Sequence, residues 1–444
     1  MPNARNQKYA EQLSRLIAHE TVSVRGQTDL SKFYAFHDLI REQFPAIFSA
    51  SEFEDFNGSF LLRWRGRDEK ALPILLMNHH DVVEATGDWT YPPFSGTIAD
   101  GKIWGRGTLD TKGGLWAMLC AADELCRGGF VPPRDVYFMS TCCEETTGNG
   151  ANTISQALKD RGMRFAMVLD EGGMILDEPV AGAHDRFAMV GVGEKGYTDL
   201  KFTARSTGGH ASTPPKNSPL VRLGKFMAAA EGGKVFKVKM SRTVRAMLKI
   251  FSTAMSGPMK LLLGHPTLFC PLICLVMPAV SGSGAAMLKT TLAFTMAQGS
   301  GGCNVLPEEA YVIGNMRYSH HQGGKDSIEA ITKLAAKFNI ETEVIHEGFD
   351  SPLSDHQSSA FKLIEGAVDT VFEGKIKTAP YVMNAASDSR FMSRVSDNCL
   401  RFAPFSISQE QFSSVHAIDE NLDVDTLSPA VDFYKYVIEN SGKI

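Results

Sequence analysis

Three short apolar runs in this chain each end in side chains that bind divalent metals. Residues 74–78 lead into His79-His80-Asp81, residues 136–141 lead toward Glu144-Glu145, and residues 165–169 lead into Asp170-Glu171. Continuous apolar runs of this length are typical of strands buried on both faces of a parallel sheet. Ligands of open α/β sheets bind just beyond the carboxyl ends of such strands. The sequence therefore predicts an α/β fold with a metal site at one edge of its sheet.

The chain is long enough for two domains. It has 444 residues, of which 43% are apolar, and single cores rarely grow beyond about 250–300 residues. From about residue 193 the pattern changes to a βα unit followed by ββαβ, with strands expected at 197–204, 291–297, 310–318 and 342–345 and helices at 219–231 and 327–338. We expect a mixed, mainly parallel sheet flanked by helices, formed by residues 1–192 and 348–444. An inserted α+β ferredoxin-like domain is expected over 193–347.

The composition excludes some classes of protein. A net charge of −5 gives no basic excess for nucleic acid, so small molecules are the expected partners. Residues 1–9 are polar and lack the apolar core of a signal peptide, which predicts a cytoplasmic location. The eight cysteines form no Cys-x-x-Cys pair and are expected to be reduced thiols. Any metal must then be bound by histidines and carboxylates.

Two adjoining segments stand apart from the rest of the chain. Residues 261–280 are mostly apolar, but Pro266, Pro271 and Pro278 interrupt them, which argues against a transmembrane span. Residues 234–249 have a basic amphipathic pattern. This pattern is more often that of a helix that covers its own domain, and the alternative is a surface for lipid, for an acyl tail or for a partner subunit.

The His-x-Asp pair has the spacing of a metal ligand and its supporting carboxylate. Alternate residues of an extended chain point the same way, so Asp81 can accept the second ring proton of His79. Taken alone, the His-x-Asp spacing is better explained by a buried, hydrogen-bonded pair than by a metal site. A glycine-rich turn over 105–114 then carries Asp110 to the start of a helix. Its spacing matches neither the dinucleotide-binding nor the P-loop pattern.

The adjacent carboxylates of Glu144 and Glu145 can take different roles. Neighbouring side chains at a strand end diverge, so one can bind metal while the other faces a metal-bound water. Two carboxylates this close repel each other, and the pKa of the one without a metal should rise toward the range of a general base. Asp170 ends the third run, where a lone Asp could also cap a helix.

Together these motifs resemble the co-catalytic zinc peptidase and aminoacylase family, which includes acetylornithine deacetylase, succinyl-diaminopimelate desuccinylase and glutamate carboxypeptidase. The resemblance covers nearly the whole chain. Residues 91–96 and the proline-interrupted apolar segment are most similar to the carboxypeptidase S branch, which includes N-fatty-acyl-amino-acid hydrolases.

The resemblance implies a site with two zinc ions, for which cobalt or manganese could substitute. Asp110 would bridge the ions, with His79 and Asp170 on one and Glu145 and His416 on the other. Glu144 would be the general base, and the Asp110–Thr111 peptide would be cis.

The resemblance also assigns roles outside the metal ligands. His210 would donate to the tetrahedral intermediate, often from the neighbouring subunit of a dimer formed through the lid domain, 193–347. Asn304 and Arg317 would hold a free carboxylate of the substrate, although Arg317 could also form a surface ion pair. Ser387 would contact the substrate, although it stands in a motif that departs from the family pattern.

These observations predict a zinc-dependent hydrolase that cleaves an amide bond next to a free carboxylate, in a peptide or an N-acyl amino acid. A metal-bound hydroxide formed by Glu144 would attack the carbonyl carbon. One alternative is a hydrolase selective for N-fatty-acyl amino acids, suggested by the apolar segment. Another is a non-catalytic dimeric scaffold that binds metal, although pure binding needs neither Glu144 nor His210.

Overall fold

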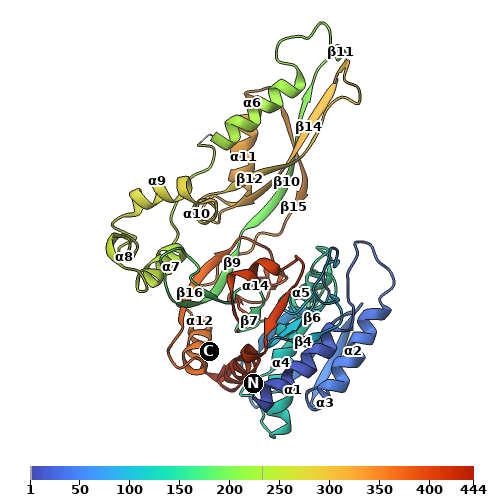
Figure 1. Ribbon diagram of the computed structural model, residues 1–444, viewed down its shortest axis with the longest axis vertical. Coiled ribbons are helices and arrows are strands. Elements are labelled where there is room, and N and C mark those ends of the chain that lie inside the picture. The colour runs from blue at the N-terminus through green and yellow to red at the C-terminus, as the bar shows by residue number, and fades with distance from the viewer. Residues whose placement is uncertain (1–2, 233) are drawn as a thin grey trace.

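Two sheets of different size organise the molecule, as Figure 1 shows for the computed structural model, which describes residues 3–232 and 234–444. The large sheet has ten strands in the order β1-β2-β6-β3-β7-β17-β9-β8-β18, with β16 paired to β9. The small sheet has four strands in the order β12-β14-β10-β15. Both chain ends lie beside the large sheet (Figure 1). The predicted fold class, a mixed and mainly parallel sheet flanked by helices, is confirmed.

The centre of the large sheet is built from the three apolar runs. β3 (Ile74–His79) lies between β6 (Val136–Thr141) and β7 (Met167–Asp170) and pairs with both in parallel. Every residue of these three strands is buried. Because the strands run parallel, their carboxyl ends meet at one edge, where the polar residues follow.

Further strands, some parallel and some antiparallel to their neighbours, complete the large sheet on both sides of this centre. One side carries the hairpin of β1 (Ser51–Phe56) and β2 (Ser59–Trp64). The other side carries β8 (Ile175–Asp177), β9 (Arg186–Glu194), β16 (Lys377–Met383), β17 (Cys399–Arg401) and β18 (Ser406–Ile407).

Helices cover both faces of the large sheet, which explains the lack of alternation in its central strands. Ile74 and Leu76 of β3 belong to the core that also contains side chains of α1 (Ala4–Ile17), α4 (Lys112–Arg127) and α15 (Leu427–Glu439). Leu75 and Met77 point to the other face, into a core with α5 (Gly150–Asp160). Further helices are α2 (Ser31–Gln43), α3 (Pro45–Ser49), α12 (Ser359–Val371), α13 (Ser389–Met392) and α14 (Gln409–Ser414).

The small sheet is antiparallel and contains the elements expected from the sequence. Its strands are β10 (Gly196–Arg205), β12 (Thr291–Gln298), β14 (Glu309–Tyr318) and β15 (Glu341–Glu347). Helices α6 (Pro219–Gly232) and α11 (Gly323–Ala336) share its core on one face. The short strands β11 (Gly209–His210) and β13 (Val305–Leu306) pair at the end farthest from the large sheet (Figure 1). The exact division at residues 192 and 348 stays a prediction.

Four helices between α6 and β12 share a core with the large sheet, and α7 packs directly on β16. They are α7 (Arg242–Ser252), α8 (Gly257–Gly264), α9 (Cys270–Val280) and α10 (Gly282–Leu288). Their core includes Phe187 of β9 and Ala379 of β16, and the rings of Phe187 and Phe251 lie 5.0 Å apart between centroids. Among the described residues, no helix has the length and apolar content to cross a bilayer.

Candidate metal centre

Asp110 lies between two histidines that come from distant parts of the chain. Its Oδ1 is 3.1 Å from Nε2 of His79, which ends β3, and its Oδ2 is 2.9 Å from Nε2 of His416. The Asp110–Thr111 peptide just before α4 is cis, as the resemblance predicted. One carboxylate thus presents each of its oxygens to a different imidazole, which is the arrangement that a bridging ligand requires.

Glu145 completes this cluster from the end of the second run. Its Oε2 is 3.1 Å from His416 Nε2, while its Oε1 is buried and has no hydrogen-bond partner. Ligand atoms of His79, Asp110 and Glu145 lie within 4.8 Å of one another. A pocket of about 480 Å³ opens beside Glu145 and His416.

Asp170 enters from the neighbouring strand. It ends β7, the parallel partner of β3, and its Oδ2 accepts the backbone N–H of Ser389 at 2.8 Å. Burial raises the pKa of Asp170, and hydrogen bonds from the backbone N–H groups of Glu171 and Ser389 partly offset this effect. The five predicted ligands therefore lie along one edge of the sheet, with His79, Asp110, Glu145 and His416 in direct contact.

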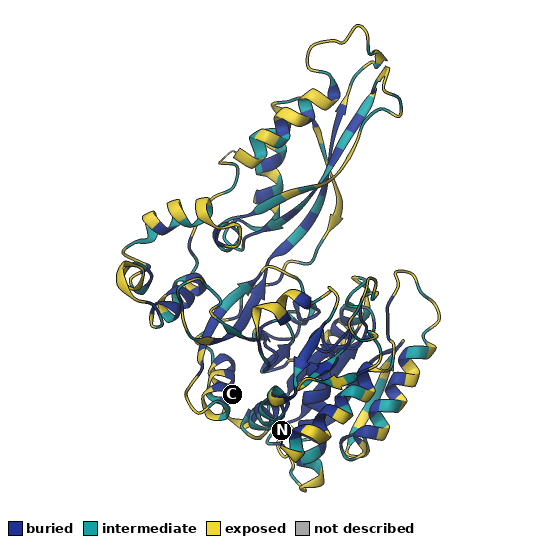
Figure 2. Ribbon diagram, viewed as in Figure 1, coloured by how far each residue is buried: buried dark blue, intermediate teal, exposed yellow. Residues whose placement is uncertain are grey.

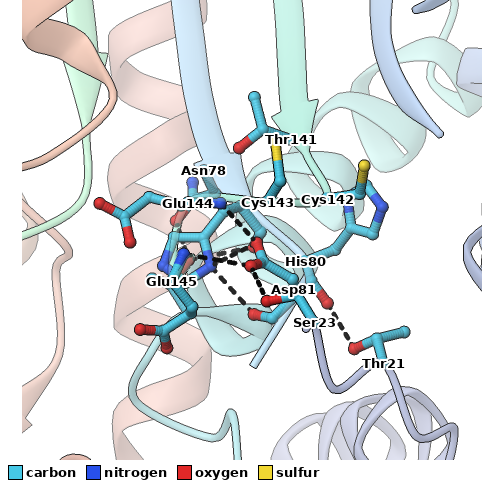
Figure 3. Close-up of polar contacts among 12 residues, drawn as sticks. Thr21, Ser23, Asn78, His80, Asp81, Thr141, Cys142, Cys143, Glu144 and Glu145 are labelled. Atoms are coloured by element: carbon cyan, nitrogen blue, oxygen red, sulfur yellow. Dashed lines mark hydrogen bonds and ion pairs between the residues drawn. The ribbon is translucent and has the colours of Figure 1, made fainter. Parts of the chain in front are cut away.

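Asp81 positions both members of the adjacent glutamate pair (Figure 3). Its Oδ1 accepts the backbone N–H of Glu144 and its Oδ2 that of Glu145, both at 3.1 Å. Ser23 Oγ donates to Oδ2 at 2.7 Å. His79 Nδ1 lies 3.0 Å from the Asp81 carbonyl oxygen and 3.4 Å from Oδ1, so the carbonyl is the closer acceptor of the ring proton. Asp81 thus supports the histidine and the two glutamates together.

Glu144 is half-buried, and its carboxyl is strongly desolvated. Burial raises its pKa well above the ordinary value, the charge of His79 opposes this shift, and the carboxylates of Asp388, Asp81 and Asp110 add to it. The rise was expected from repulsion by Glu145, but burial is its main cause. The side chains of Glu144 and Glu145 diverge from their shared backbone (Figure 3), as the sequence predicted for neighbouring residues at a strand end.

The chemistry of this cluster fits divalent cations. Imidazole nitrogens and carboxylate oxygens are ligands for zinc, cobalt and manganese. Asp110 and Glu145 raise the pKa of His416 to about 10, which shows a negative field that attracts positive charge. Burial raises the pKa of two further carboxyls nearby, Asp388 and Glu171. A bound cation would relieve the desolvation of these acids and supply a partner for Glu145 Oε1.

Glu420 anchors the loop that carries Asp110, a role that the sequence did not reveal. It is fully buried and belongs to the same motif as His416. Its Oε1 accepts backbone N–H groups of Gly107 at 3.1 Å, Leu109 at 2.8 Å and Asp110 at 3.1 Å. Arg106 Nη1 donates to its Oε2 at 2.7 Å.

Ser387 is fully buried, away from open solvent. Its hydroxyl donates at 2.9 Å to Glu194, which also pairs with Arg401 at 3.2 Å. Its predicted contact with substrate stays a prediction. The neighbouring Asp388 accepts a hydrogen bond from Thr141 at the end of β6, and burial raises its pKa to about 6. Neither Asp388 nor the Glu194–Arg401 pair was singled out from the sequence.

The remaining predicted residues lie on the small sheet. His210 is exposed in β11, at the distal tip of the molecule (Figure 1), and its Nδ1 lies 2.7 Å from Ser212 Oγ. Asn304 is next to it, since its carbonyl oxygen accepts the N–H of Ala211 at 2.9 Å. Arg317 lies near the opposite end of β14 with a buried Nη1 that has no partner. Within one chain, His210 and Asn304 therefore lie far from Arg317 and the metal centre.

Comparisons with known proteins agree with this geometry. A sequence model of peptidase family M20/M25/M40 matches residues 75–440. The chain is 31% identical to a probable carboxypeptidase S-like 2 of Dictyostelium discoideum over 446 residues, covering 98% of this chain and 85% of that protein. It is 31% identical to the human N-fatty-acyl-amino acid synthase/hydrolase PM20D1 over 414 residues, covering 91% and 82%. These relatives confirm the predicted carboxypeptidase S branch.

Solved structures show the same fold. The M20 family metallo-carboxypeptidase Sso-CP2 of Sulfolobus solfataricus superposes with a TM-score of 0.71 at 16% identity, covering 97% of this chain and 98% of that one. Bacillus subtilis YXEP, described as a dinuclear metal binding peptidase from the M20 family, gives 0.61 at 11% identity over the full length of both chains. The chain therefore belongs to peptidase family M20/M25/M40 and is a hydrolase of peptide or linear amide bonds.

Proposed function

We propose that this enzyme is a dinuclear metallohydrolase that cleaves an amide bond next to a free carboxylate, in peptides or N-acyl amino acids. The observation that carries this proposal is Asp110, whose two oxygens face the Nε2 atoms of His79 and His416. A structural ion pair needs one histidine, whereas a bridge between two metals needs a donor on each side.

The two metal positions follow from this bridge. His79 and Asp170 would hold one ion with Asp110, and Glu145 and His416 would hold the other. Two ions bound there, zinc by expectation, would polarise the scissile carbonyl and acidify water. The backbone bonds from Asp81 and Glu420 keep Glu145 and Asp110 in position for this task.

Glu144 is the proposed general base. It accepts the proton of the attacking water and then transfers it to the nitrogen of the leaving amine. Its raised pKa suits both steps, because a base is most effective when its pKa is near the working pH.

The substrate's carboxylate is assigned to Arg317 and Asn304, and the oxyanion to His210. Eight residues of strand separate Arg317 from the distal start of β14, which is about 27 Å at the usual rise per residue. A second copy of the chain that places its distal tip at this centre would bring its His210 to the reacting carbonyl and its Asn304 to the substrate's carboxylate beside Arg317. We therefore propose a homodimer through the small sheet. The cytoplasmic location stays a prediction.

A hydrolase selective for N-fatty-acyl amino acids is the second candidate. It is favoured by the similarity to PM20D1 and by the exposed leucines of α8 and α9. The non-catalytic scaffold is set aside, because the chain is a family hydrolase with a half-buried Glu144 at the centre.

The test is hydrolysis of a substrate panel by chelated protein to which zinc or manganese is returned. Dipeptides, N-acetyl and N-oleoyl amino acids are compared, each with its C-terminal amide as the matched control. We expect metal-dependent release of the amino acid from the free acids and at least tenfold slower cleavage of the amides. Equal rates on acids and amides would refute recognition of the carboxylate, and equal rates on both acyl lengths would remove the second candidate.

A further inference from the structure

One segment of the chain has basic residues and no acidic residue. Between residues 232 and 307 there is no Asp or Glu, although the whole chain has a net charge of −5. The segment contains eight basic residues, Lys234, Lys237, Lys239, Arg242, Arg245, Lys249, Lys260 and Lys289. The acidic excess is thus confined to the rest of the protein, and this segment is a positive region on an otherwise negative molecule.

The same segment exposes large apolar side chains on α8, on α9 and between them. Leu268 and Leu275 are each 74% exposed and Val280 is 76% exposed. The set comprises Met259, Leu261, Leu268, Leu272, Leu275, Val276 and Val280, which we call the apolar face. Isolated exposed leucines are ordinary, but a group of this size on adjoining helices indicates an interaction surface.

The apolar face has a helical period. Leu272, Leu275 and Val276 of α9 recur at the three- and four-residue spacing of one helix side, and Leu268 lies in the turn just before this helix. The opposite side of α9 points inward, where Ile273 belongs to the core shared with α7 and α8. Figure 2 shows the outward side of α9 in the colour of exposed residues. The apolar side chains are therefore exposed on one side of a helix whose other side is packed in the core.

Basic side chains accompany the apolar face. Arg242 and Lys249 are exposed on α7, and Lys260 is exposed on α8. Val244 and Met247 of α7 share one core with Leu263 of α8, so these charges and the apolar face belong to one rigid unit. An apolar helix side with flanking Lys and Arg is the pattern of a helix in the interface of a membrane with anionic lipids.

We propose that the apolar face and its flanking basic residues dock this protein on the surface of a bilayer that contains anionic lipids. α9 has 11 residues, about 16 Å of helix, so it would lie in the interface and could not span the hydrocarbon layer. A second copy of the chain is disfavoured as the occupant, because a symmetric contact would oppose two positive segments. The proposal does not depend on the proposed function.

The test is co-sedimentation of the full chain with vesicles. One set is made of phosphatidylcholine alone and the other of phosphatidylcholine mixed with phosphatidylglycerol. We expect binding to the mixed vesicles, weakened by salt, and little binding to the neutral ones. Leu275→Asp should weaken binding roughly tenfold, and Lys249→Glu about fivefold or more.

Matched controls separate this surface from general effects of charge. Leu72→Asp changes a leucine that is 50% exposed elsewhere, and Lys362→Glu reverses an exposed lysine on α12. Both should bind as the unchanged protein does, and all four variants should unfold at the same temperature. Absence of binding to mixed vesicles, or equal losses in variants and controls, would overturn the proposal. So would a Leu275→Asp protein that changes its oligomeric state but not its vesicle binding.

Discussion

The carboxylate of Glu420 accepts the backbone N–H of Asp110, with 3.1 Å between nitrogen and Oε1. This bond ties the motif of the last ligand to the loop of the bridging ligand, 310 positions earlier in the chain. The same carboxylate pairs with the buried Arg106. Two separate parts of the metal centre thus share one buried anion.

Replacing Glu420 with Gln should destabilise the fold and loosen the metal centre. The amide leaves the Arg106 charge buried without its counter-charge, which reduces the free energy of unfolding by about 3–5 kcal/mol. Urea unfolding of the metal-free protein measures this loss. Glu410→Gln changes an exposed glutamate in α14 and is the control. Identical unfolding midpoints for the two variants would contradict the anchoring role.

Asp81→Asn should weaken metal binding about 10- to 100-fold, the usual effect of removing a supporting group behind metal ligands. The two carboxylate oxygens of Asp81 accept the backbone N–H groups of Glu144 and Glu145. In asparagine an NH₂ group replaces one of these oxygens and cannot accept a hydrogen bond, so one of the two bonds is lost. Competition with a chelator measures the affinity. Ser23→Ala removes only one donor and should have a smaller effect. Unchanged affinity in Asp81→Asn would show that the Asp81 carboxylate is not needed to hold the metal ligands in position.

Arg317→Lys should reduce kcat/KM for substrates with a free carboxylate roughly 10- to 100-fold, because lysine keeps the positive charge but cannot form the bidentate contact of arginine. Cleavage of the matching C-terminal amides should barely change, since they never used that contact. The ratio of the two rates is the measurement. An equal decrease on acids and amides would mean that Arg317 acts on the fold and not on the substrate.

His37 should make the fold sensitive to acid. It is 2% exposed, its Nε2 has no partner, and burial lowers its pKa to about 4, against 6.5 in an unfolded chain. Between pH 6.5 and 4 the unfolded chain binds more protons at this residue, so stability falls as the pH falls, by about 3 kcal/mol in total.

The variant His37→Leu tests this linkage through urea unfolding at several pH values. Its stability should fall less steeply between pH 6.5 and 4 than that of the unchanged protein. His265→Gln alters an exposed histidine and should leave the slope as it is. Parallel pH profiles for all three proteins would rule out His37 as the source.

The sequence predicted those parts of the site that directly follow buried strands. His79 and Asp170 are the last residues of β3 and β7, and Glu145 follows the end of β6. The carboxyl ends of neighbouring parallel strands lie at the same edge of the sheet, whatever the conformation of the loops. His416 could not be found this way, because it lies in a loop before the short strand β19 (Asn421–Asp423). Only the resemblance to a family identified it.

Long-range packing was beyond prediction for a physical reason. A helical period shows that one side of a helix is buried, but not which surface buries it, so the packing of α7–α10 on β9 and β16 was missed. Glu420 was missed because an acidic residue in a loop gives no sign of donors far away in the chain. Asp388 was missed because its hydrogen-bond donor is Thr141, which lies at the end of a distant strand.

The central claim is that Glu144 performs proton transfer beside two metal ions that other residues hold. The most direct measurement is the metal content and turnover of Glu144→Gln, prepared with zinc and assayed on an N-acyl amino acid. The account predicts two metal ions per chain, as in the unchanged protein, with kcat lower by about 10²- to 10⁴-fold. Unchanged turnover in this metal-replete variant would contradict it.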